Sequence, residues 1–245
     1  MSLNAVVLAA GKGTRMNSQS SKMLLSLGGR PLLHYLMDTL SDLNNCDITL
    51  VLGYQSEKIE QSLQHYTFDK VYQDTPLGTG HAVQQAFPVL RKHQPNYVLV
   101  LPGDSPFIQK ETLEKMLTLH QRMHAKATVL SAVLDDPGAY GRILRDSNNQ
   151  LMAIREFKDC SKKEAAINEI NSGIYLFNLD VLLSNLPQLK NDNAQNEFYL
   201  PDIVECLHQS AQVVASYCLN DPQEILGVNT PEDLALLRRL VPHFS

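Results

Sequence analysis

The chain has few cysteines, and none of them is arranged for a metal site or a disulfide framework. Four cysteines occur in 245 residues, at Cys46, Cys160, Cys206 and Cys218, and no two form a Cys-x-x-Cys pair. This spacing excludes the common zinc patterns and a small secreted fold held by disulfides. We therefore expect four free thiols and a cytoplasmic protein, because free thiols persist in a reducing compartment.

The sequence also lacks a long apolar run. No segment approaches the ~20 apolar residues that a helix needs to span a bilayer. The first residues do not combine a basic segment with a following apolar run, as a signal peptide would. We expect neither a leader nor a membrane partner.

An excess of positive charge is absent as well. The chain carries 21 Lys and Arg against 26 Asp and Glu, which gives a formal net charge of −5. This balance excludes a strongly basic surface that attracts nucleic acid or an anionic membrane. We expect no nucleic-acid partner, and a phosphate ligand would have to meet a local group of cations.

Short apolar runs alternate with helical patterns in the first half of the chain. Strands are expected at residues 5–10, 48–52, 70–72 and 97–102. Helices are expected between them, at residues 31–43, 56–65 and 80–90. Near-continuous apolar strands separated by helices favour a parallel sheet covered on both faces. Ligands of such sheets bind beyond the carboxyl ends of the strands.

The second half has a less regular pattern. Strands are expected at residues 127–134, 140–144, 151–157, 172–178 and 213–217, with the second and third antiparallel. Helices are expected at residues 181–186 and 201–209, and a last helix begins at Pro231 after possible capping residues Asn229 and Thr230. No repeat or linker divides the chain, so we predict one α/β domain over residues 1–245.

A glycine-rich cationic loop follows the first expected strand. The stretch AVVLAAGKGTRM, residues 5–16, lacks the Gly-Lys-Ser/Thr of a Walker A loop. Met16 stands where a dinucleotide fingerprint needs a third small residue. Small residues let a base or phosphate approach the backbone, and Lys12, Arg15 and Lys22 can offset a triphosphate. A strand-to-helix turn with solvated charges is the alternative.

Two further loops carry polar residues at expected strand ends. In VLVLPGDSP, Asp104 follows a buried strand, where it could bind Mg²⁺ or cap the next turn. In QDTPLGTGHA, Gln73 could read a nucleobase edge, and the following Gly-Thr-Gly exposes backbone N–H groups. A turn with a helix cap is the alternative for the second loop.

Nine short motifs occur in the order seen in sugar nucleotidyltransferases, and the chain resembles that family. They are LAAGKGTRM, PLGTGHA, GDSP, DDPGAYGRI, EFKD, NEINSGIY, NAQNEFYLPDI and GVNTPEDL, together with Lys22. The chain is most similar to the uridylyltransferase half of the bifunctional N-acetylglucosamine-1-phosphate uridyltransferases/glucosamine-1-phosphate acetyltransferases, from about Ala5 to Leu237. The resemblance implies a Rossmann-like, mixed, mostly parallel sheet with helices on both faces and a small antiparallel sugar-binding subregion.

The resemblance also implies residue roles. Residues that line the base, ribose and phosphates would be Leu8, Ala9, Ala10, Gly11, Gln73, Gly78, Thr79 and Gly103. Arg15 and Lys22 would hold the phosphates and stabilise the departing pyrophosphate, and Asp104 and Asn229 would bind Mg²⁺. The sugar and its acetamido group would meet Gly141, Glu156, Asn171, Glu197 and Tyr199.

The implied reaction is Mg²⁺-dependent transfer of UMP from UTP to N-acetylglucosamine 1-phosphate or a related N-acetylhexosamine 1-phosphate. The sugar phosphate would attack the α-phosphorus in line, without a covalent intermediate. Residues of about 1–110 would bind the nucleotide, about 111–228 the sugar, and 229–245 would return as a helix to the metal site. Two alternatives stay open: a nucleotidyltransferase using another nucleoside triphosphate or sugar phosphate, and a non-catalytic nucleotide-sugar-binding module.

The chain departs from the resembled family in several places. It reaches Ser245 without the repeat pattern of an acetyltransferase half, so we expect no acetyl transfer and leave the oligomeric state open. Ser172 stands where threonine is usual, Asn196 replaces a common glycine, and Pro102 precedes the Gly-Asp pair. These changes leave open which hexosamine and nucleobase are used.

Overall fold

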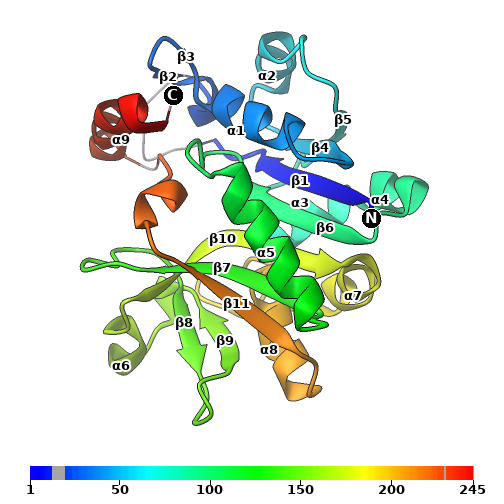
Figure 1. Cartoon of the computed structure of the whole chain (residues 1–245), viewed down its shortest axis with the longest axis vertical. Helices are drawn as coiled ribbons and strands as arrows, with labels where there is room; N and C mark the ends of the chain where they lie inside the picture. Colours follow the sequence, from blue (N-terminus) through cyan, green and yellow to red (C-terminus); the bar gives the residue numbers. More distant parts are fainter. Residues whose placement is uncertain (13–19, 229, 245) are drawn as a thin grey trace.

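The computed structural model describes residues 1–12, 20–228 and 230–244 (Figure 1). The strands within these ranges are β1 (Leu3–Ala9), β2 (Ser26–Leu27), β3 (Arg30–Pro31), β4 (Cys46–Leu52), β5 (Asp69–Tyr72), β6 (Tyr97–Pro102), β7 (Ala127–Val133), β8 (Arg142–Arg145), β9 (Leu151–Arg155), β10 (Glu169–Asn178) and β11 (Val214–Leu219). Each strand expected from the sequence is present, with ends shifted by a few residues.

Nine of these strands join in one sheet, whose main path runs β11-β7-β10-β6-β1-β4-β5. β1 pairs in parallel with β4 and β6, and β4–β5 and β7–β11 are also parallel. β10 is antiparallel to β6 and β7, and β8 and β9 extend from it as an antiparallel pair. The predicted mixed, mostly parallel sheet with a small antiparallel region is confirmed.

The helices of the described ranges are α1 (Leu32–Ser41), α2 (Ser56–Ser62), α3 (Thr79–Gln85), α4 (Phe87–His93), α5 (Lys110–Arg122), α6 (Lys162–Ala165), α7 (Leu179–Asn185), α8 (Asp202–Gln209) and α9 (Pro231–Phe244). Short 3₁₀ turns are η2 (Lys22–Leu24), η3 (Phe157–Asp159), η4 (Leu186–Gln188) and η5 (Pro222–Ile225).

Two expectations for the helices were wrong. The single helix expected over residues 80–90 is divided at Ala86, because Pro88 lacks an N–H group and fits only the first turn of a new helix. The helix α5 was not expected at all. Its buried stripe consists of four residues, of which Thr112 and His120 are polar, so the segment has a low apolar content despite its amphipathic character.

Helices cover both faces of the sheet because the side chains of β1 alternate between two cores. Leu3, Ala5 and Val7 pack with residues of α1, α2 and α5. Val6 points to the opposite face, where α3, α4, α7 and α8 supply the partners. Figure 1 shows this arrangement, with α1 and α5 in front of the sheet and α3, α7 and α8 behind it. Burial of each large apolar side chain stabilises the fold by about 1.5–3 kcal/mol.

The C-terminal helix packs on a third, smaller core beside the β2–β3 hairpin. Leu234 and Leu237 of α9 meet Leu27 and Phe107 there. Thr230 caps the helix as expected: its hydroxyl accepts the Asp233 N–H at 3.2 Å, and the Asp233 carboxylate accepts the Thr230 N–H at 2.8 Å. Asn229 lies outside the described residues. Phe107 follows closely after β6, so this core ties the C-terminal segment to the β6 end of the sheet.

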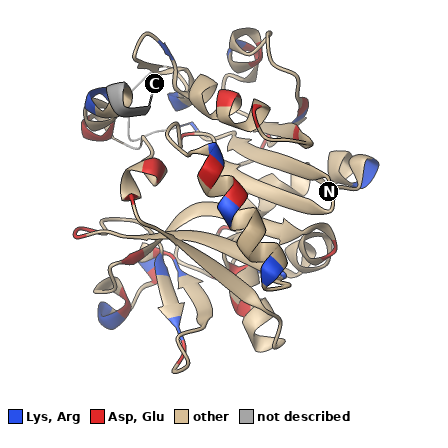
Figure 2. Cartoon of the chain, in the orientation of Figure 1, with Lys and Arg blue, Asp and Glu red and all other residues tan. Residues whose placement is uncertain are grey.

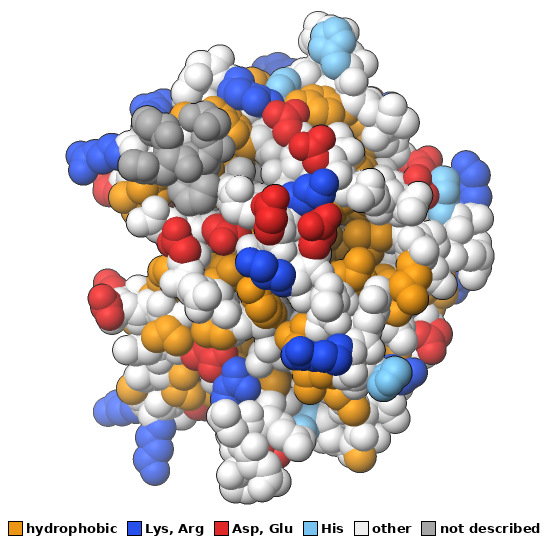
Figure 3. Space-filling view, in the orientation of Figure 1, with side chains coloured by type: hydrophobic (Ala, Val, Ile, Leu, Met, Phe, Trp, Pro, Cys, Tyr) orange, Lys and Arg blue, Asp and Glu red, His pale blue; other side chains and the backbone are white. Residues whose placement is uncertain are grey.

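Charged side chains are distributed over both halves of the molecule (Figure 2). Acidic and basic residues alternate along α5, where Lys110 pairs with Glu114, and they face outward in the space-filling view (Figure 3). All four cysteines are free, as expected. Among the described helices, none combines the length and apolar character required to traverse a bilayer.

Acid should weaken the attachment of α5 to the sheet through His120. This side chain is buried, its Nε2 lies 2.7 Å from Asn178 Oδ1, and its Nδ1 lies 2.8 Å from the Thr128 hydroxyl. Burial lowers the pKa of His120. Below about pH 6.5, His120 therefore binds a proton more readily in the unfolded chain than in the folded chain. The free energy of unfolding consequently decreases as the pH is lowered through this range.

Urea unfolding of the wild type and His120→Gln at pH 7.5 and 5.5 measures this effect. At pH 7.5 we expect the wild type to have a larger free energy of unfolding than His120→Gln. We expect this difference to decrease on acidification by at most about 1.4 kcal/mol per pH unit. An advantage that stays constant or grows on acidification would contradict the role of neutral His120.

Candidate active site

The parallel strands β1, β4, β5 and β6 end at the same edge of the sheet, and their following loops pack backbone to backbone. The Gly103 N–H donates to the Leu8 carbonyl at 2.9 Å, and the Tyr54 N–H donates to the Ala10 carbonyl at 3.2 Å. A Cβ added to Gly53 would lie 2.8 Å from the Ala10 oxygen. Larger residues at such positions would force the loops apart.

The first cavity at this edge, the β1–β5 cavity, has a volume of about 650 Å³. It is lined by Ala10, Lys12, Gly53, Tyr54, Ser56, Tyr72, Gln73, Asp74, Pro76 and Glu197. The Gln73 amide nitrogen donates to the Gly78 carbonyl at 3.1 Å and lies 3.0 Å from His81 Nδ1. These contacts fix the carboxamide, and no described residue donates to its Oε1, which can therefore accept a hydrogen bond from a ligand.

The turn at residues 76–80 is joined to the segment at residues 197–200. The Phe198 N–H donates to the Leu77 carbonyl and the Phe198 carbonyl accepts the Gly80 N–H, both at 2.8 Å. The Thr79 hydroxyl accepts the Leu200 N–H at 3.0 Å. Gly78 has a φ of +108°, and a Cβ there would lie 2.6 Å from the Phe198 oxygen. Only glycine satisfies both constraints.

The second cavity, the Asp104 cavity, has a volume of about 470 Å³. Six residues predicted from the sequence line it, namely Lys22, Thr79, Asp104, Gly141, Glu156 and Asn171. The remaining wall consists of Pro102, Ser105, Ala139, Tyr140, Phe157, Lys158, Ser172, Gly173, Gln195, Ile225 and Gly227. The segments at 73–79 and 195–197 contribute residues to the walls of both cavities, so the two cavities are neighbours at this edge.

Lys22 and Asp104 form an ion pair at the centre of this edge. The Lys22 ammonium donates to Asp104 Oδ2, and Asp104 is 6% exposed. Ser21 fixes the turn that carries Lys22, because its N–H donates to Gln55 Oε1 at 2.8 Å and its hydroxyl accepts the Met23 N–H. The cation is thus held in place before any ligand binds.

The surroundings of Asp104 suit a hard cation. A Cβ on Gly227 would lie 3.3 Å from Asp104 Oδ2, so glycine keeps the space beside this oxygen open. Mg²⁺ is often bound by only one or two protein oxygens and keeps several waters. Among the described residues, no three His, Cys, Asp or Glu side chains are grouped as a metal site. Arg15 and Asn229, the other predicted phosphate and metal residues, lie outside the described residues.

Glu156, directly after β9, and Asn171 of β10 line the same cavity. A Cβ on Gly141 would lie 3.3 Å from Glu156 Oε1, so glycine allows this close approach. The Asn171 N–H donates to the Gly141 carbonyl at 2.9 Å, and its side-chain amide donates to the Tyr175 hydroxyl at 2.6 Å. The buried Tyr175 therefore orients Asn171 from behind.

An irregularity in β10 presents this part of the strand to the cavity. The register of β10 against β7 shifts between Asn171 and Tyr175, and Gly173 within the shift has a φ of +80°. The Ser172 hydroxyl donates to the Leu130 carbonyl at 2.7 Å and accepts the Ile174 N–H at 3.1 Å. Ser172 thus stabilises the bulge, and the bulge changes the direction of the neighbouring side chains of β10.

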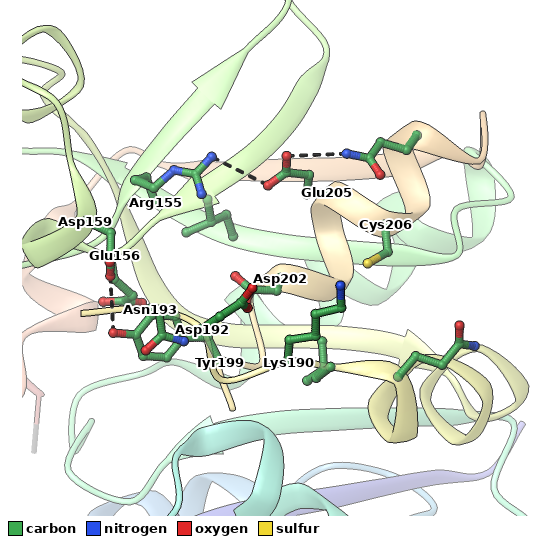
Figure 4. A pocket seen from close by; sticks show the side chains of 14 residues that line it. Arg155, Glu156, Asp159, Lys190, Asp192, Asn193, Tyr199, Asp202, Glu205 and Cys206 are labelled. Carbon is green, nitrogen blue, oxygen red and sulfur yellow. Dashed lines mark hydrogen bonds and ion pairs between the residues drawn. The ribbon is translucent and has the colours of Figure 1, made fainter. Parts of the chain in front are cut away.

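A third cavity, the α8 cavity, lies behind Glu156 and has a volume of about 450 Å³ (Figure 4). Its wall includes the acidic residues Glu156, Asp159, Asp192, Asp202 and Glu205. Burial raises the pKa of Glu156 to about 7, and the charges of Asp202, Asp159 and Glu197 add to the shift. Burial likewise raises the pKa of Asp202 to about 6.

The remaining predicted residues are placed as follows. Tyr199 lines the α8 cavity, and its hydroxyl donates to Asp159 at 3.2 Å and accepts from Gln195 at 2.9 Å. Glu197 lines the β1–β5 cavity, apart from the other expected sugar residues. Ala9 is fully buried in the core below the loop, and Gly11 is exposed.

Sequence reasoning did not select several residues that shape the site. Gly227 and Phe157 belong to the motifs GVNTPEDL and EFKD, so the resemblance contained them without assigning them a role. Tyr175 likewise ends the motif NEINSGIY without an assigned role, whereas Gly53 belongs to none of the motifs, because a glycine after a strand is common in any α/β fold.

Comparisons with known proteins agree with this geometry. The family model of the MobA-like NTP transferase domain matches residues 5–166, more than half of the chain. The bifunctional protein GlmU of Listeria monocytogenes serovar 1/2a is 41% identical over 237 residues, which cover 97% of this chain and 51% of the relative. The bifunctional protein GlmU of Bacillus subtilis strain 168 is 41% identical over 92% of this chain and 49% of its own length. The chain therefore spans about half the length of these relatives.

Solved structures show the same fold at low sequence identity. A UDP-glucose pyrophosphorylase complexed with UDP-glucose superposes with a TM-score of 0.78 at 17% identity, covering 99% of both chains. A protein described as a glucose-1-phosphate thymidylyltransferase of Bacillus anthracis has a TM-score of 0.80 at 20% identity, covering 100% of this chain and 97% of the other. The family resemblance and the fold inferred from the motifs are confirmed.

The raised pKa of Glu156 predicts an unusual stability profile. The folded chain holds the Glu156 proton up to about pH 7, whereas an unfolded glutamate releases it near 4.5. Stability is therefore lost as pH rises between these values. Glu156→Gln removes this penalty, so the variant should exceed the wild type by about 1–3 kcal/mol above pH 7 and by much less at pH 5. Urea unfolding at both pH values measures the difference.

Glu169→Gln is the matched control. Burial of Glu169 is outweighed by hydrogen bonds from Arg145 and Ser131, which lower its pKa. This variant should be less stable than the wild type at pH 7. If Glu156→Gln also destabilises the protein at pH 7, the assigned surroundings of Glu156 are wrong.

Proposed function

We propose that this chain, which belongs to the MobA-like NTP transferase domain family and is a nucleotidyltransferase, transfers UMP from UTP to N-acetylglucosamine 1-phosphate or a related N-acetylhexosamine 1-phosphate. The products would be the UDP-N-acetylhexosamine and pyrophosphate. The observation that carries the proposal is the Lys22–Asp104 pair in the wall of the cavity that also contains Glu156 and Asn171, at the same sheet edge as the cavity with Gln73.

The relatives support the choice of substrates. The chain shares 41% identity with proteins named bifunctional GlmU over nearly its whole length. Its motifs resemble the uridylyltransferase half of the bifunctional enzymes that act on N-acetylglucosamine 1-phosphate. In the proposed complex, Gln73 faces the base, and Asn171 and Glu156 face the sugar with groups that can bond its amide and hydroxyls.

The chain's own residues would act mainly by positioning and by charge stabilisation. Lys22 donates charge-assisted hydrogen bonds to the phosphates, and Arg15 is proposed to share this role. Mg²⁺, held by Asp104 and, in the proposal, by Asn229, would neutralise phosphate charge when bound. The attacking phosphate is already ionised near pH 7, so the site needs no general base. In the proposed complex, nucleotide and sugar phosphate bound in the two neighbouring cavities would be aligned for in-line attack.

Another nucleotide or sugar phosphate is the second candidate. It is favoured by Ser172, which departs from the usual threonine beside the sugar residues and forms the bulge of β10. Structures of the same fold carry names with uridine, thymidylyl and CMP groups. A binding module without catalysis is disfavoured, because a sensor does not need the paired cation and carboxylate found in the wall of the Asp104 cavity.

A substrate panel tests the proposal. Purified protein is incubated with each of the four nucleoside triphosphates and with several hexose and hexosamine 1-phosphates, and pyrophosphate release is measured. We expect the highest kcat/KM with UTP and an N-acetylhexosamine 1-phosphate. Preference for another pair by tenfold or more would select the second candidate, and no release from any pair would contradict transferase activity.

The metal assignment is tested separately at Asp104. Asp104→Asn should lower kcat at least about 100-fold, as loss of one charge-stabilising group at a reacting phosphate typically does. It should also weaken Mn²⁺ binding measured by electron paramagnetic resonance in the presence of UTP. Asp180→Asn, on the exposed surface of α7, is the control and should change neither value. Equal Mn²⁺ binding by wild type and Asp104→Asn would refute the assignment.

A further inference from the structure

We infer that Phe157 is a specificity-determining residue that packs against the apolar C–H groups of the bound sugar. This inference rests on the proposed function, because it concerns the sugar part of the same site. Phe157 directly follows Glu156 and lines the Asp104 cavity. Its side chain is 43% exposed, although a large apolar ring is normally buried.

A buried cation holds the ring in position. The Arg142 guanidinium carbon lies 5.1 Å from the centre of the Phe157 ring, a distance typical of a cation–π contact. Arg142 is 1% exposed, and no described carboxylate forms an ion pair with it. Its nitrogen atoms donate instead to the backbone carbonyls of Pro137 (3.3 Å), Gly138 (2.9 Å), Tyr140 and Ala165 (3.4 Å).

Burying the Arg142 guanidinium without a carboxylate partner costs desolvation free energy. A buried charge without a carboxylate partner depends entirely on hydrogen bonds for its stability. Here those bonds fix the loop at residues 137–141, which ends at Gly141 in the cavity wall, while the face of the guanidinium meets Phe157. One side chain therefore sets both the loop and the ring on the sugar side of the site.

The turn that carries Phe157 is also fixed at its other end. Lys158 donates to Gln195 Oε1 at 2.8 Å, and Asp159 accepts the Ala194 N–H at 2.9 Å. These bonds connect η3 to the segment that borders both cavities. The exposed ring is thus held on a rigid support, as expected of a preformed binding wall.

The chemistry of a pyranose matches this wall. Its hydroxyl groups point outward from the ring, whereas its C–H groups form apolar faces that pack well on aromatic rings. Glu156 supplies an acceptor for hydroxyl groups, and the adjacent Phe157 supplies the apolar surface. Consecutive residues therefore provide both kinds of contact that a sugar needs.

The test compares binding of a nucleotide sugar with binding of the nucleotide alone. The affinities of UDP-N-acetylglucosamine and UDP for wild type, Phe157→Ala and Phe157→Tyr are measured by calorimetry. We expect Phe157→Ala to weaken binding of the nucleotide sugar at least fivefold and to leave UDP binding within twofold. Phe157→Tyr, which keeps the ring, should bind the nucleotide sugar within twofold of wild type.

Phe87→Ala is the matched control, because the Phe87 ring meets the Arg91 guanidinium at 5.5 Å outside the site. It should change neither affinity. The inference is overturned if Phe157→Ala binds both ligands as wild type does, if it weakens both equally, or if the wild type binds the nucleotide sugar no better than UDP. Failure of the proposed function is distinct, since it would show as no pyrophosphate release while the binding difference persists.

Discussion

The contact between the ends of β1 and β6 is the constraint on which the site depends. Leu8 pairs with Pro102, and the Gly103 N–H continues the pairing by donating to the Leu8 carbonyl. This register brings the end of β1 level with the end of β6, where Lys22 at the start of η2 meets the Asp104 carboxylate. A one-residue shift between these strands would move Asp104 out of line with the end of β1.

Much of this arrangement was predictable from the sequence, because buried parallel strands are nearly continuous apolar runs and their carboxyl ends share one edge. Lys22 and Asp104 are 82 residues apart, yet that rule was enough to bring them together. The helix α5 was missed because few of its residues are buried. The bulge at Asn171 depends on three strands at once, and no local pattern in the sequence encodes it.

Surroundings, rather than residue type, give the glutamates of this region their different properties. Glu169 meets Arg145 and Ser131, so its carboxylate is stabilised despite partial burial. Glu156 is partly buried, and desolvation together with the nearby charges of Asp202 and Asp159 raises its pKa, so its proton is held more tightly. The sequence places both residues beside strands but cannot show which charges converge on them, because those charges come from distant segments.

The charge of the Asp104 cavity bears on how a negatively charged chain could bind a triphosphate. Lys22 and Lys158 are the described cations in its wall, and Asp104 and Glu156 balance them formally. Lys22 is paired with Asp104, and Lys158 is bonded to Gln195. These two lysines alone therefore leave the negative charge of a bound triphosphate largely uncompensated. Lys12 lines the neighbouring β1–β5 cavity, and in the proposal Mg²⁺ beside Asp104 and a further cation such as Arg15 would supply additional positive charge.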